Sequence, residues 1–155
     1  MRIEYCDQWS IIQKEPFNSI DIEKARQNHI NKELYTAIIL EDDVVVNTIE
    51  ITDIYINVRF MNELATPYLS YVFDVKDDEN IFHTATYYTL YNEKGNEKLE
   101  TMAFSFSENG YTVMERRDLV TGEVDERYLD DDDVTSKWDK FPEFGKYEHL
   151  LREER

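Results

Sequence analysis

The spacing of apolar residues changes once along the chain, from helical to alternating. Apolar residues recur at roughly helical spacing over Ile22–Leu34, after an Asn18-Ser19 pair whose side-chain oxygens are suited to capping a helix. This pattern predicts one helix over about residues 19–33. Before it, residues 3–13 favour a strand that Pro16 interrupts, because proline lacks the amide hydrogen that a central strand donates.

Alternation of apolar and polar residues dominates from Tyr35 onward and predicts strands. The parity of the alternation reverses between Ile51 and Ile54, so a turn or bulge is expected at Thr52-Asp53. Asn109-Gly110 predicts a hairpin with a type I′ turn, in which both residues have positive φ. Strands are expected at 36–40, 44–51, 69–75, 81–91, 101–106, 111–117 and 124–129, and the alternation also continues over 54–60.

Short polar turns between successive strands favour antiparallel pairing. The expected fold is therefore α+β: an N-terminal helix packed on an antiparallel β-meander of about six to seven strands, followed by a short C-terminal helix. We expect residues 1–155 to form a single domain, since a chain of this length buries a substantial core.

Charge is the strongest global signal, because 34 acidic residues against 17 basic ones give a net charge of −17. Such a field repels nucleic acid and anionic membranes and speeds encounter with a basic partner. The start of the chain lacks the pattern of a signal peptide, and no segment has the apolar length of a transmembrane helix. Cys6 is the only cysteine, so a disulfide scaffold is excluded. We expect a cytoplasmic protein.

The acidic residues are concentrated in two regions. Glu33–Val75 holds eight acidic residues against Arg59 alone, and Glu123–Asp133 holds seven against Arg127 alone. A surface that only keeps a protein soluble is expected to mix negative and positive charges. These regions carry almost only negative charge and therefore indicate a surface for a basic protein partner. The candidate partner-binding residues are the acidic run Asp130, Asp131, Asp132 and Asp133, the nearby aromatic residues Trp138, Phe141 and Phe144, and the acidic turn Glu41, Asp42 and Asp43.

No catalytic, cofactor or metal motif is found. His29, His83 and His149 match no metal-ligand spacing, and the acidic run lacks the alternate ligands and the glycine of an EF-hand loop. Nucleophile motifs and phosphate-binding glycine loops are absent as well. We expect a binding protein that is not an enzyme and that uses no cofactor.

The acidic single domain, the plan of one helix and a meander, and the Glu123–Asp133 run leading into WDKFPEF together resemble the immunity proteins of bacterial polymorphic toxins. The resemblance implies that the chain binds a cognate toxin domain, often a nuclease, and blocks its active site or an adjacent surface. No catalytic residues follow from it. Two alternatives stay open: a nucleic-acid mimic that inhibits a DNA-binding or restriction protein, and a lipocalin-like barrel with a small-ligand pocket.

Overall fold

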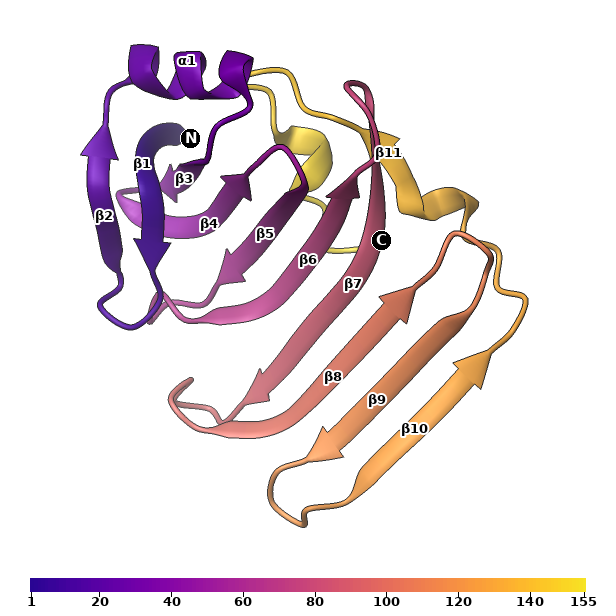
Figure 1. Ribbon diagram of the computed structural model, residues 1–155. Coiled ribbons are helices and arrows are strands. Elements are labelled where there is room, and N and C mark those ends of the chain that lie inside the picture. Colours follow the sequence, from indigo (N-terminus) through magenta and orange to yellow (C-terminus); the bar gives the residue numbers. More distant parts are fainter.

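The computed structural model describes residues 1–155 and arranges them around one large antiparallel sheet (Figure 1). Ten strands lie in the order β10-β9-β8-β7-β6-β5-β4-β3-β1-β2, and the eleventh, β11, pairs with β7. The strands are β1 (Arg2–Ser10), β2 (Glu15–Ile20), β3 (Tyr35–Glu41), β4 (Val44–Ile51), β5 (Tyr55–Met61), β6 (Pro67–Val75), β7 (Asn80–Tyr91), β8 (Lys98–Phe106), β9 (Thr112–Asp118), β10 (Val124–Leu129) and β11 (Trp138–Lys140). The other elements are the helix α1 (Ile22–Asn31) and the 3-10 turns η1 (Thr135–Lys137) and η2 (Glu148–Leu150).

The predicted combination of an antiparallel sheet with one helix is confirmed, but its finer details are wrong. The sheet has eleven strands instead of six to seven, and α1 follows two strands instead of preceding the sheet. The expected C-terminal helix is the single 3-10 turn η2. One reason for the undercount is Pro16, which lies in the edge strand β2 opposite Trp9, where an amide hydrogen is not needed.

The helix α1 is shorter than predicted because its caps lie inside the expected range. Asp21 is the N-cap, and its carboxylate accepts a hydrogen bond from the Lys24 amide at 2.7 Å, whereas Asn18 and Ser19 belong to β2. The helix ends at Lys32, which adopts a left-handed conformation with a φ of 57°. Inside the helix, Ala25 and Asn28 are buried.

The main core lies on one face of the sheet, which we call the covered face. Tyr5, Ile39, Ile49, Val58 and Phe73 belong to a cluster of 16 buried residues on this face. Helix α1 lies at one end of the sheet and contacts β1 and β3 (Figure 1). Tyr147 and Leu150 from the C-terminal segment belong to the same cluster. A second cluster of five, which includes Cys6 and Ile38, has the opposite strand parity and lies on the other face.

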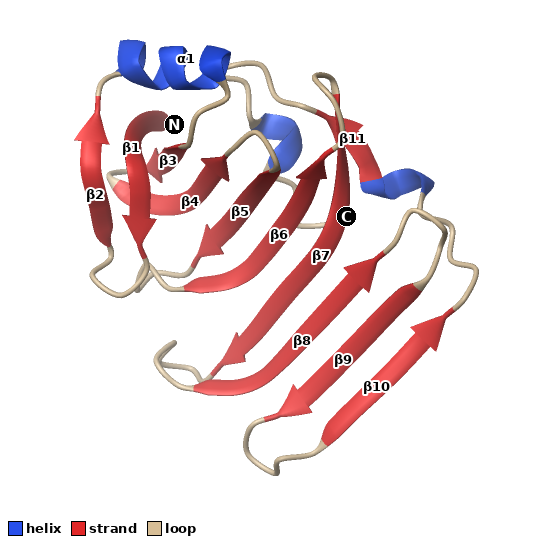
Figure 2. Cartoon of the chain, viewed as in Figure 1, coloured by secondary structure: helices blue, strands red, loops and turns tan.

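The strands β8, β9 and β10 extend beyond this core (Figure 2). None of their residues belongs to either buried cluster, and all six residues of the edge strand β10 are exposed. The sheet is open, with β2 and β10 as its two edges. This rules out a closed barrel.

Two turns show how local chemistry shapes the meander. The predicted turn at Thr52 is confirmed: its hydroxyl accepts hydrogen bonds from the amides of Ile54 and Tyr55. The predicted type I′ turn at Asn109-Gly110 is wrong, because only Gly110 has a positive φ, of 90°. Positive φ at two successive residues occurs instead at Asp42 and Asp43, between β3 and β4. Aspartate tolerates this region because its short polar side chain can hydrogen-bond locally.

Candidate functional site

The acidic run Asp130–Asp133 forms the connection that follows β10 and is fixed at two points. The Asp132 amide donates to the carbonyl of Gly110 at 2.9 Å, and the Thr112 hydroxyl donates to the Asp132 carboxylate at 3.0 Å. Asp133 accepts hydrogen bonds from the amide and hydroxyl of Thr135, and these bonds lower its pKa. None of the four carboxylates forms an ion pair with a cation.

The second acidic feature, Glu41–Asp43, lies far from the first. It occupies the turn between β3 and β4, where Asp43 pairs with Arg2 at 2.5 Å. Six strand spacings separate β4 from β10, which corresponds to about 29 Å along the sheet. Because all pairings are antiparallel, the end of β3 and the end of β10 also lie at opposite ends of the sheet. The two features do not form one surface.

The three candidate aromatic residues occupy two different environments. Trp138 in β11 is 42% exposed and packs edge-on against Phe82. Phe141 and Phe144 are half-buried, pack against the main core, and both contact the ring of His29. Core packing accounts for the two phenylalanines, so only Trp138 has the exposure that a binding anchor needs.

Exposed apolar residues that the sequence did not single out lie next to the acidic run. Tyr128 and Leu129 end β10 and are largely exposed, and the Tyr128 ring stacks on Tyr111 with centroids 6.3 Å apart. The signal that could have identified them is their position in the sequence, directly before Asp130. Together with Trp138 they place apolar area near unpaired negative charge.

A cavity of about 580 Å³ lies over the covered face of β8 and β9. Phe104, Phe106 and Met114 contribute apolar side chains to it, and Lys137 and Arg155 contribute cations. Lys137 is only 8% exposed, and its ammonium lies 4.1 Å from the centroid of the Phe106 ring. Burial lowers the pKa of Lys137, the nearby Asp132 carboxylate opposes this, and Arg155 lowers it further. No feature of the sequence pattern brings these residues together.

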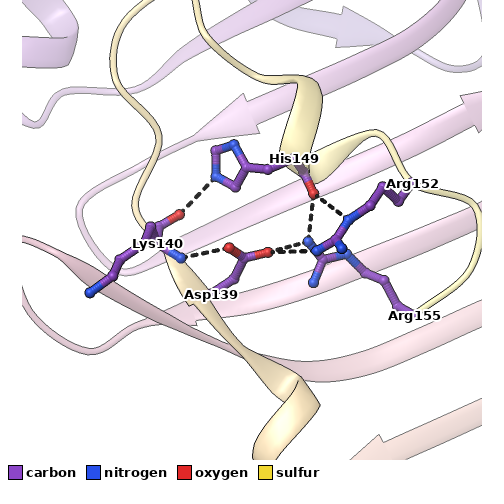
Figure 3. A network of polar contacts seen from close by, with 5 residues as sticks. All are labelled: Asp139, Lys140, His149, Arg152 and Arg155. Carbon is purple, nitrogen blue, oxygen red and sulfur yellow. Dashed lines mark hydrogen bonds and ion pairs between the residues drawn. The ribbon is translucent and has the colours of Figure 1, made fainter.

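A polar network holds Arg155 beside this cavity (Figure 3). Its guanidinium donates to the Asp139 carboxylate and to the backbone carbonyl of His149, and the His149 ring donates to the Lys140 carbonyl at 2.9 Å. Arg152 also donates to Asp139, at 3.4 Å. The network joins β11 to the segment that follows η2, and so fixes the C-terminal segment against the sheet.

His29 and His83 serve packing roles in this fold. The ring of His83 is buried between Tyr71, Phe73 and Phe106, and burial, followed by the charges of Lys137 and Arg155, lowers its pKa to about 3. His29 contacts the hydroxyl of Tyr35 at 2.8 Å, and burial lowers its pKa. No group of three or more His, Cys, Asp or Glu side chains is arranged to hold a metal ion.

None of the helices has the length and apolar character needed to cross a bilayer. Comparisons of the chain with protein-family models, with curated proteins and with solved structures each found no match.

Proposed function

We propose that this chain is an inhibitor-type binding protein that neutralises a basic protein partner in the cytoplasm, as an immunity protein neutralises its toxin. The observation that carries the proposal is the acidic run Asp130–Asp133, whose four carboxylates have no cationic partner and adjoin the exposed Tyr128 and Leu129. Exposed aromatic area beside unpaired charge is the combination found at protein–protein hot spots.

The unpaired charge in this run favours a basic partner over simple solubility. Four adjacent carboxylates repel one another, and no cation neutralises them, whereas on the neighbouring strands Glu115 pairs with Arg117 and Asp125 with Arg127. A cationic partner surface would relieve this repulsion. If the partner is a nuclease, the carboxylates would compete with substrate phosphate for its lysine and arginine side chains, which is inhibition by occlusion without catalysis.

The distribution of charge favours a local patch over a nucleic-acid mimic. A mimic presents an extended array of negative charges, whereas the two acidic features here lie six strand spacings apart. A single partner that covers β10, the acidic run and Trp138 fits this arrangement better. The open edge of β10 adds unpaired backbone groups to the same surface.

The proposal is tested by capture and identification at low salt, with a matched variant. The protein and its D130N/D131N/D132N/D133N variant are each immobilised and exposed to lysate of the source organism, and retained proteins are identified and then purified for direct binding. We expect one basic protein to bind the unmodified chain tightly and the variant weakly, and to lose its toxic activity in the complex. An E41Q/D42N/D43N variant should retain the partner.

Three results would contradict the proposal. They are the absence of any specific basic partner, equal binding by both surface variants, and a purified partner whose activity the protein leaves unchanged. Binding to several unrelated DNA-binding proteins would instead support the nucleic-acid mimic.

A further inference from the structure

On the covered face, β8 and β9 present an apolar floor that other segments cover only in part, through residues such as Lys137 of η1 and Arg155. Phe104 and Phe106 stack with an interplanar angle of 7° and centroids 6.3 Å apart, and Met114 lies opposite Phe104 on the neighbouring strand. Helix α1, Tyr147 and Leu150 pack against the main core instead, and the floor stays half-exposed. A concave apolar surface of this kind marks a binding site.

Lys137 places an unpartnered cation at this floor. Its side chain is more than nine-tenths buried, yet its ammonium takes part in none of the side-chain hydrogen bonds or ion pairs of the protein. It lies over the Phe106 ring, and the Asp132 carboxylate is close enough to act on it electrostatically. The Lys137 nitrogen keeps some contact with solvent although the residue as a whole is buried, so its three donors are open to the cavity. An anion in the cavity would satisfy them.

Two further residues that line the cavity are positively charged, as Lys137 is. Arg155 lies at the cavity with its Nε buried and without a hydrogen-bond partner, because Asp139 and His149 engage only the end of its guanidinium. Arg127, which pairs with Asp125 outside the cavity, is a third cation of the lining, and Asp132 is the only carboxylate there. An excess of cations is unexpected in a protein with a net charge of −17. It indicates a local preference for anions.

From this arrangement we infer that the cavity binds a small amphipathic carboxylate, with its apolar chain on Phe104 and Met114 and its carboxylate at the Lys137 ammonium. The volume of about 580 Å³ falls within the range of about 300–1,000 Å³ typical of small-molecule sites. The Thr86 and Thr112 hydroxyls in the lining supply further polar contacts. The cavity adjoins the partner surface proposed above, because Tyr128, Leu129 and Asp132 also line it, but Phe104, Met114 and Lys137 are not part of that surface.

Methyl NMR of the four methionines tests the site in the unmodified protein. Met114 lines the cavity, whereas Met61 is buried in the cluster on the opposite face and serves as an internal control. Titration with octanoate should shift the Met114 methyl and leave Met61 in place. Titration with 1-octanol, which has the same chain and no charge, should give binding weaker by about tenfold, because the charged contact is missing.

A lysine variant then locates the carboxylate. K137M keeps an unbranched side chain over Phe106 and removes the charge, so octanoate affinity should fall about tenfold while octanol affinity changes little. K146M, at an exposed lysine paired with Glu143, should behave as the unmodified protein. Equal affinity for octanoate and octanol, a Met114 methyl that does not move, or full octanoate affinity in folded K137M would overturn the inference. The comparison of the two ligands needs no variant and holds even if K137M fails to fold.

Discussion

The Asp139 carboxylate and the Arg155 guanidinium form the most deeply buried ion pair of the protein, with side chains 15% and 2% exposed. Burial raises the pKa of Asp139, but the hydrogen bonds from Arg155 and from the Lys140 amide outweigh it, and the net shift is downward. The pair joins β11 to the segment after η2. It therefore links two parts of the chain that pack on the same face of the sheet.

Replacing Asp139 by Asn should destabilise the fold by about 3–5 kcal/mol, because it leaves the buried Arg155 charge without its partner. The double variant D139N/R155M should lose less, since no unpaired charge remains. Urea denaturation measures both, with E143Q as a control because Glu143 pairs with Lys146 at the surface. A D139N variant as stable as E143Q would show that the buried pair contributes nothing.

Stability should depend on pH through His83. The unfolded histidine takes up a proton near its ordinary pKa of 6.5, whereas the folded one does so only at about 3. Between these values the unfolded state binds more protons, so the free energy of unfolding should fall as pH decreases, by up to about 1.4 kcal/mol per pH unit. H83F should reduce this slope. Denaturation at pH 7, 6, 5 and 4 measures it, and identical slopes in both proteins would contradict the assignment to His83.

Gly110 should tolerate substitution poorly, because a Cβ there would meet the backbone oxygen of Asp132 at 2.8 Å and its φ is 90°. G110A should cost about 2–4 kcal/mol, through backbone strain and displacement of the acidic run. Gly122 is a matched control: its φ is 81°, and nothing lies within 4 Å of its Cβ position. G122A should cost only the strain, about 1–2 kcal/mol. Thermal unfolding of the two variants compares them, and equal losses would show that the close approach is unimportant.

If electrostatic attraction drives formation of the proposed complex, the association rate should depend on the charge of Asp130–Asp133. Substituting Asp130–Asp133 with Asn keeps an acceptor oxygen for Thr112 and Thr135 and removes four charges. Association at low salt should slow by about tenfold, with a flatter dependence on ionic strength and a smaller change in dissociation. Stopped-flow mixing over a range of salt concentrations measures this. An unchanged association rate would show that the acidic run is only a solvated loop.

Sequence reasoning succeeded where structure depends on close neighbours. Alternation identified most of the strands, and the reversal of parity located the turn at Thr52. It failed at Asn109-Gly110, where a longer turn leaves Asn109 outside the left-handed region, and at Pro16, where only the edge position of β2 makes proline acceptable. Neither outcome can be read from a few adjacent residues.

The sequence by itself determined the antiparallel alternation, the presence of one helix and the excess of negative charge. Tertiary structure decided that Phe141 and Phe144 pack in the core and that the two acidic features lie apart. It also decided that Lys137 and Arg155 line one cavity with Phe106 and Met114. The physical reason is the distance along the chain between the residues that determine each feature. Local periodicity fixes which face of its own strand a side chain occupies, but strand order and the path of the C-terminal segment determine what covers that face.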